Sequence, residues 1–230
     1  MAWLSPDEST ALYLSLTVAG RSVLLNLPFA ILIAWVLTRG RFAGRTVLDA
    51  IVHLPMVLPP VVVGFVLLLV FGTRGFIGAW LDRVFDIQLV FTRNGAALAT
   101  AVMSLPLMVR TIRLSLENVD RGLEDAARTL GAGALDRFAS ITMPLILPGV
   151  LAGAVTAFSA GLGEFGAVIT FVSNIPGETR TLPLALYTAL QSPGGNAEAI
   201  RLACISIGLG LAGLTVSEWF ARRLRRRLGR

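Results

Sequence analysis

Long apolar stretches alternate with short polar segments along the whole of this chain. Five of the apolar stretches are long enough to cross a lipid bilayer as helices, which takes about 20 residues. We therefore expect an all-α integral membrane protein, a polytopic bundle of about five transmembrane helices at 12–37, 47–71, 96–116, 145–172 and 202–220. A sixth apolar stretch, 182–190, is too short to span a bilayer and is expected to form a re-entrant or surface helix.

The second of these stretches contains three prolines close to its start, Pro55, Pro59 and Pro60. Each proline lacks a backbone N–H, and its ring clashes with the preceding turn of a helix. Inside a membrane, such a break needs neighbouring protein groups to satisfy the backbone that it frees. The second span is therefore predicted to be kinked or broken near its start.

Composition supports membrane insertion over a soluble fold. The chain has 230 residues, of which 55% are hydrophobic and 15% are charged, and its mean hydropathy is +0.75. Soluble domains carry about 25% charged residues, so most of the outer surface is expected to face lipid. The net charge is +6, but the arginines lie between and after the apolar stretches without forming a continuous basic face. No nucleic-acid partner is expected.

The arginines are distributed unequally between the two sides that five spans define. Fourteen of the 20 basic residues fall in 39–45, 110–137 and 222–230, whereas five fall in 74–93 and 180–201. Positively charged loops remain in the cytoplasm, which predicts a periplasmic N-terminus, 1–11, and a basic cytoplasmic tail, 221–230. Termini on opposite sides agree with an odd number of spans. The tail is also expected to anchor the last span at the inner lipid headgroups.

The chemistry that the sequence lacks excludes several functions. All basic residues are arginine, so the chain has neither the lysine of a phosphate-binding loop nor a lysine for Schiff-base catalysis. One histidine, His53, and one cysteine, Cys204, exclude an internal disulfide and a Cys/His zinc site. We expect no catalytic residue, metal ligand or bound cofactor in this chain. If ATP powers the protein, another subunit binds the ATP.

A short amphipathic helix is predicted in the cytoplasmic segment 118–144. Apolar residues recur there at helical spacing, at Leu123, Ala126, Ala127 and Leu130. Asp120 is expected to cap the start of this helix, and Gly131 to end it in a left-handed conformation. The apolar face admits two interpretations: it packs against its own bundle or lipid, or it docks into a groove on a soluble partner.

The same segment resembles the EAA loop of the permease subunits of ABC importers. That loop reads Glu-Ala-Ala, three residues, Gly, nine residues, then Ile-x-Leu-Pro. The matching positions here are Asp125, Ala126, Ala127, Gly131, Ile141, Met143 and Pro144. Asp125 replaces the glutamate and Met143 the leucine. In that family the loop contacts the ATPase, so the resemblance implies that it forms the coupling element here, with Leu123 and Leu130 on its apolar face.

The resemblance covers nearly the whole chain and implies a type 1 ABC permease domain over 12–220. The stretches 53–64, 101–110 and 163–181 look like the molybdate permeases in particular, although sulfate permeases share part of the second half. The family implies a bacterial inner-membrane homodimer, two copies of an ATPase subunit that binds ATP and magnesium, a molybdate-binding protein outside, and alternating access. Sulfate or tungstate is an alternative cargo. An ATP-independent channel or secondary transporter is the alternative class.

Small residues recur every four positions along the fourth span, at Gly149, Gly153, Ala157 and Gly161. Such stripes let helices approach closely inside membranes. Two interpretations are open: simple packing within one subunit, or a lining for the pathway between two permease copies. Ser159 and Glu164 lie further along the same span, and these six residues are the candidates for the translocation pathway. Glu164 is expected near the outer headgroups, ~30 Å beyond the start of the span.

Two other polar features lie inside predicted spans. Arg21 is midway along the first span, where it either offers a positive charge to an anion, pairs with a carboxylate or extends to the interface. We favour the structural role. His53 follows Asp49 by four residues, so both lie on one helix face. They are predicted to form a packing pair rather than a proton relay.

Overall fold

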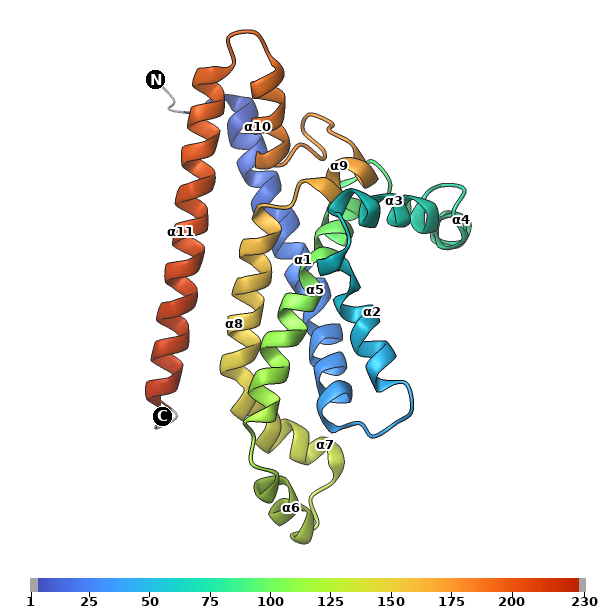
Figure 1. Cartoon of the computed structure of the whole chain (residues 1–230), viewed down its shortest axis with the longest axis vertical. Coiled ribbons are helices and arrows are strands. Elements are labelled where there is room, and N and C mark those ends of the chain that lie inside the picture. Colours follow the sequence, from blue (N-terminus) through green and yellow to red (C-terminus); the bar gives the residue numbers. More distant parts are fainter. Residues whose placement is uncertain (1–3, 228–230) are drawn as a thin grey trace.

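A computed structural model describes residues 4–227, and its regular elements in that range are all helices (Figure 1). Three helical segments of this part are each long and apolar enough to cross a membrane. They are α1 (Pro6–Arg39), α5 (Arg93–Glu117) and the continuous segment Ala134–Leu162. The all-helical membrane fold expected from the sequence is confirmed.

The first helix begins with strong local signals and is longer than the predicted span. Ser5 and Glu8 form a capping box, with Pro6 in the first turn. Helix α1 therefore starts within the segment that was expected to precede the membrane, and residues 1–3 of that segment lie outside the described part. Along α1, Ala30 and Ala34 are fully buried in the cluster that also contains Met108 of α5. These small side chains let α1 and α5 pack closely at the centre of the bundle.

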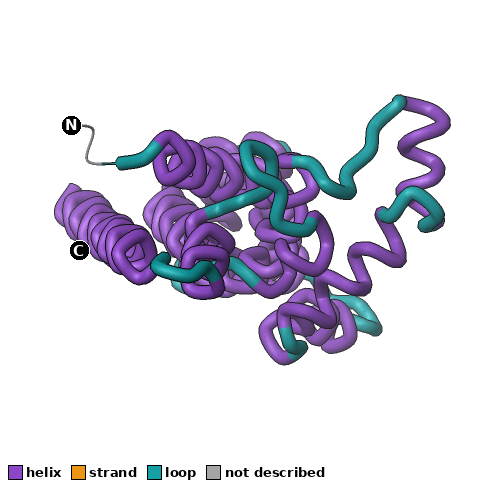
Figure 2. Tube along the Cα trace, turned by 90° about the horizontal axis from the view of Figure 1, so that it is seen from above, coloured by secondary structure: helices purple, strands orange, loops and turns teal. Residues whose placement is uncertain are grey.

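The second span is broken, as its prolines predict. From helix α2 (Arg45–Val57) to helix α3 (Pro60–Phe71), the direction of the chain bends by 116°. Between them, Leu58 is extended and Pro59 has no N–H with which to continue the helix. Helix α3 then leads into α4 (Phe76–Phe85), and both extend to one side of the bundle (Figures 1 and 2). Counted as one broken span, α2 and α3 bring the apolar spans of the described part to four.

The fourth span differs from the prediction at both ends. It begins with α7 (Ala134–Arg137), continues through a π-helical turn η1 (Phe138–Thr142) and becomes α8 (Met143–Leu162). The helix does not continue to residue 172, because the chain turns at Gly163 and restarts as α9 (Gly166–Val172). Glu164 caps that restart by accepting a hydrogen bond from the Ala167 N–H at 2.9 Å. Helix α9 packs beside α3.

The last two helices close one side of the bundle. Helix α10 (Leu182–Gln191) has 10 residues, so it is too short to span, as predicted, and it packs against α1 and α11. Helix α11 (Asn196–Arg227) has 32 residues and contains the predicted fifth span, 202–220. The side chains of the basic tail, 221–230, lie outside the described residues. The total of five spans therefore stays a prediction.

A polar contact joins the first and last helices. The Glu8 carboxylate is 1% exposed and lies 2.8 Å from the guanidinium Nη2 of Arg201 on α11. Arg201 Nε also donates to Glu8 at 2.9 Å. Glu8 therefore has both a capping role in α1 and an ionic partner near the start of α11. Figure 1 shows this end of the bundle opposite the end that carries α6 (Arg121–Thr129) and the last turns of α11.

Candidate functional site

The amphipathic helix α6 forms where the sequence predicts it. Asp120 caps it by accepting a hydrogen bond from the Gly122 N–H at 2.8 Å. After its last turn, Gly131 has a φ of 89°, the left-handed conformation that glycine adopts most readily. Both end signals are confirmed. Figure 1 shows α6 at one end of the bundle, beyond the long helices.

The apolar side of α6 is open in this chain. Leu130 is 88% exposed and Leu123 is 48% exposed. Asp125 and Ala126 are exposed as well, and Ala127 is half-buried. No residue of α6 is buried, so the interpretation that its apolar face packs against its own bundle is not supported. The remaining matched positions lie in the following helix, where Ile141 is half-buried and Pro144 is exposed.

Glu124 attaches α6 to the transmembrane helices. Its Oε1 lies 3.1 Å from Nη2 of Arg39, at the end of α1. The same oxygen accepts a hydrogen bond from the buried hydroxyl of Thr142 at 2.8 Å. Thr142 ends the π-helical turn that runs directly into α8. One carboxylate therefore connects α6 to both α1 and α8.

Sequence reasoning missed Glu124 and singled out its neighbour Asp125. The match to the EAA-loop pattern draws attention to Asp125, whose side chain is exposed. Glu124 and Arg39 are 85 residues apart, and no spacing rule relates them. The one available signal is that an acidic residue in the first turn of a helix needs a cationic or hydroxyl partner when the fold encloses it.

The small-residue stripe of α8 serves helix packing. Gly149, Gly153 and Ala157 are buried, and a Cβ on Gly149 would overlap Ser115 of α5. At Gly153 an added Cβ would lie 3.3 Å from the Met108 carbonyl. Within one chain, Gly149 and Gly153 thus pack α8 against α5, which favours the packing interpretation; a lining role between two permease copies stays a prediction. Ser159 faces Gly213 of α11.

Gly161 and Glu164 do reach a cavity. A cavity of about 280 Å³ lies beside the α2–α3 break, and its lining comes from α2, α3, α5 and the end of α8. The residues that line it include Pro55, Pro60, Thr100, Met103, Ser104, Leu107, Gly161 and Glu164. Thr100 is buried, and its hydroxyl has no hydrogen-bond partner among the described residues. Glu164 is half-buried at this cavity, in the turn that leads to α9.

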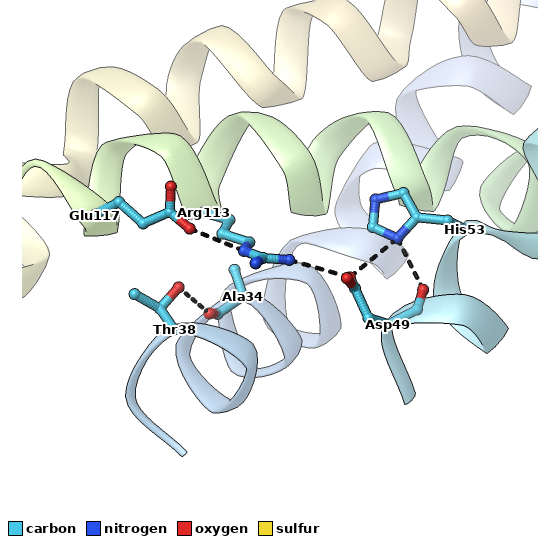
Figure 3. Close-up of polar contacts among 6 residues, drawn as sticks. All are labelled: Ala34, Thr38, Asp49, His53, Arg113 and Glu117. Carbon is cyan, nitrogen blue, oxygen red and sulfur yellow. Dashed lines mark hydrogen bonds and ion pairs between the residues drawn. The ribbon is translucent and has the colours of Figure 1, made fainter. Parts of the chain in front are cut away.

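A charged network joins α2 to α5 nearer the α6 end of the bundle. Nδ1 of His53 lies 3.3 Å from an Asp49 carboxylate oxygen, which confirms the predicted pair. The same oxygen of Asp49 lies 3.1 Å from Nη1 of Arg113, whose Nε lies 3.0 Å from Glu117. Figure 3 shows the Arg113 guanidinium held between the two carboxylates. Sequence spacing predicted the contact within α2 but not the bridge to α5.

Other polar side chains have structural partners. Arg21 donates to the side-chain oxygen of Asn94 on α5 at 2.8 Å, so its partner is an amide rather than a carboxylate. Within residues 4–227, no group of three or more His, Cys, Asp or Glu side chains is placed to hold a metal ion. Three groups of polar side chains thus bear on the candidate site: those of α6, of the cavity beside the α2–α3 break and of the α2–α5 network.

Comparison with known proteins identifies relatives over almost the full chain. Residues 26–226 match the family described as "Binding-protein-dependent transport system inner membrane component". The chain is 57% identical over 227 residues to the molybdenum transport system permease protein ModB of Escherichia coli K12, with 99% of each chain covered. It is 38% identical to the sulfate transport system permease protein CysT of the same organism, covering 96% of this chain and 80% of that one.

The fold has a counterpart among solved structures. A chain of the crystal structure of a bacterial ABC transporter for import of the acidic polysaccharide alginate matches with a TM-score of 0.72. The match covers 97% of the present chain and 81% of the other, at 20% sequence identity. At that identity the likeness concerns the fold alone.

Proposed function

The chain belongs to the family of binding-protein-dependent transport system inner membrane components, and from this premise we propose that it is the permease subunit of an ATP-driven importer for molybdate. The assignment of molybdate as cargo rests on the difference in sequence identity to two relatives. Identity to the molybdenum permease is 57% over 99% of both chains, whereas identity to the sulfate permease is 38% over 80% of that protein. Sulfate is the second candidate, because that relationship also extends over nearly the whole chain.

The proposed coupling element is the segment around α6. Its apolar side chains Leu123 and Leu130 are exposed, and burying such side chains in a partner's groove stabilises docking by about 1.5–3 kcal/mol each. Asp125 and Gly131 would lie at the same interface with an ATPase subunit. Movement of the docked helix would pass through Glu124 to α1 and α8 together, because that carboxylate contacts Arg39 and Thr142. Alternating access would follow from this shared connection.

The assembly proposed around the chain is that of a binding-protein-dependent importer. A second copy of the chain would complete the pathway, and two ATPase subunits would bind ATP with magnesium. A periplasmic molybdate-binding protein would deliver the cargo. We place the protein in the bacterial inner membrane with its N-terminus outside and α6 and the C-terminus in the cytoplasm. The arginine asymmetry of the sequence and the position of α6 and the C-terminus at one end of the bundle support this orientation.

A complementation experiment tests the cargo. Cells that lack their own molybdate and sulfate permeases would receive this chain together with its ATPase and binding protein. We expect molybdoenzyme activity at low external molybdate to be restored, and uptake of labelled molybdate to be inhibited more strongly by unlabelled molybdate than by sulfate. Rescue of growth on sulfate without rescue of molybdoenzyme activity would replace molybdate by sulfate as the cargo.

A further inference from the structure

The central cavity and the α2–α5 network lie along one face of α5. Positions 103 and 107 line the cavity, and positions 110, 114 and 117 line a second pocket of about 320 Å³. These five positions recur at intervals of three or four residues, so they share one side of the helix. On α2, Asp49, His53 and Met56 follow the same rule, with the first two at the second pocket and the third at the cavity. The two spaces therefore lie in line along the adjoining faces of α2 and α5.

The second pocket contains two guanidinium groups and two carboxylates, and one of the two guanidinium groups is unpaired. Its lining contains Asp49, His53, Arg110, Arg113, Leu114 and Glu117. Arg113 is shared between the two carboxylates, whereas Arg110 is exposed and has no hydrogen-bond or ionic partner among residues 4–227. His53 engages Asp49 through Nδ1, which leaves its Nε2 without a partner in the same part of the chain. One guanidinium, that of Arg110, is thus available to donate to a ligand.

We propose that this pocket is a binding site for a tetrahedral oxyanion at the cytoplasmic end of its path through the permease. Arg110 makes the first contact, because its planar guanidinium presents paired N–H donors that match two oxygens of such an anion. Arg113 makes the second contact by exchanging a carboxylate for the anion, and His53 lies beside the two arginines in the pocket lining. The inference rests on the proposed function, which supplies an oxyanion as cargo. It adds the location and the residues of a site within this chain.

Because of the two carboxylates, the site binds the anion weakly and releases it readily. Asp49 and Glu117 already occupy Arg113, so an incoming anion must displace them or bind beside them. Like charges at this separation repel, and carboxylates compete directly for the guanidinium donors. The anion is therefore held weakly and released when the carboxylates return to Arg113. A site without them would bind more tightly and release more slowly.

The chain contains one histidine, which provides a direct probe of the pocket. With isotope-labelled histidine, the full-length permease in lipid nanodiscs gives a single imidazole signal, that of His53. We expect this signal to shift saturably on titration with sodium molybdate, and also with sodium sulfate. In Arg110→Gln the apparent affinity should fall about tenfold or more, the loss expected for a charge-assisted contact. The matched control is Arg74→Gln, which removes an exposed charge in the turn after α3 and should leave the titration unchanged.

Three results would overturn the site. The first is an equal shift with sodium chloride at the same ionic strength, and the second is an unchanged titration in Arg110→Gln. The third is the absence of any shift in a permease that imports molybdate in cells, which would leave the proposed function intact. If the His53 signal responds to oxyanions but cells import no molybdate, the cargo assignment fails and the site stands. Far-UV circular dichroism and gel filtration of each variant verify that it is folded.

Discussion

Thr142 donates a hydrogen bond of 2.8 Å to Glu124, and this contact joins the exposed helix α6 to the transmembrane helix that follows it. The same carboxylate oxygen is 3.1 Å from Arg39 at the end of α1. The ion pair is largely enclosed, with the side chains of Arg39 and Glu124 12% and 21% exposed, and the Thr142 hydroxyl is buried. A helix that would otherwise project on flexible loops is therefore fixed to two membrane spans through one side chain.

Replacing Glu124 should loosen this connection. In Glu124→Gln, Arg39 loses its ionic partner while remaining enclosed, which costs about 1–3 kcal/mol in the free energy of unfolding. We expect a lower thermal midpoint for the purified permease and weaker stimulation of the ATPase by loaded binding protein. The control is Asp125→Asn, which removes an exposed carboxylate and should change the free energy of unfolding by less than about 0.5 kcal/mol. Equal midpoints for the two variants would show that the Glu124 contacts do not stabilise the fold.

Gly131 and Gly133 form a matched pair for testing the end of α6. Both have open space where a Cβ would lie, but Gly131 has a φ of 89° and Gly133 a φ of −65°. Gly131→Ala should therefore cost about 1 kcal/mol in backbone strain, whereas Gly133→Ala should cost little. Gly131→Arg should in addition weaken ATPase co-purification and abolish uptake, with the permease still inserted. Wild-type stoichiometry of the ATPase with Gly131→Arg, together with wild-type uptake, would show that this loop is not the coupling element.

The packing role of Gly149 predicts a specific rescue. An added Cβ would overlap the Ser115 side chain, so Gly149→Ala should destabilise the α5–α8 contact by about 1–3 kcal/mol. Combining it with Ser115→Gly removes the opposing side chain and should recover part of the loss. Gly208→Ala on α11, where nothing lies within 4 Å of the added Cβ, should be neutral or slightly stabilising. Thermal unfolding followed by gel filtration measures these variants together with Ser115→Gly alone, and additive losses in the double variant would exclude a direct contact.

The orientation in the membrane is testable with fusions at the two ends of the bundle. Green fluorescent protein fused after residue 230 should fluoresce, because it matures in the cytoplasm. Alkaline phosphatase inserted in the 86–92 segment should be active, because it folds only outside. An active phosphatase after residue 230 would reverse the orientation and move α6 away from any cytoplasmic ATPase.

Local signals in the sequence predicted much of the fold. Pro59 and Pro60 predicted the break between α2 and α3, because the absence of an N–H acts on the residues beside it. Asp120 and Gly131 predicted both ends of α6, because a capping side chain and a left-handed glycine also act on the adjacent backbone. The end of α8 was wrong by ten residues, at Leu162 instead of 172. The segment after Gly163 remains apolar, and a turn stabilised by Glu164 leaves no interruption in hydropathy.

Contacts between distant segments were beyond sequence reasoning. Pairing Glu124 with Arg39, or Arg113 with Asp49, requires knowing which helices are neighbours. The small-residue stripe on α8 predicted close helix packing but not the neighbouring helix, which the structure identifies as α5. The alignment of the two spaces between α2 and α5 depends on the rotation of both helices about their axes. Periodicity defines a face of one helix but not the helix that it meets.

The pairing of Glu8 with Arg201 has a consequence for how the protein is made. Translation produces α1 first, and the guanidinium that neutralises its buried carboxylate emerges 193 residues later. Until then the first helix carries an unpaired acid at a position that the finished bundle seals from water. A chain interrupted before α11 would leave that carboxylate with its capping contact to Ser5 but without its ionic partner. The ion pair that fixes the start of α1 in the bundle therefore forms only after α11 has been synthesised.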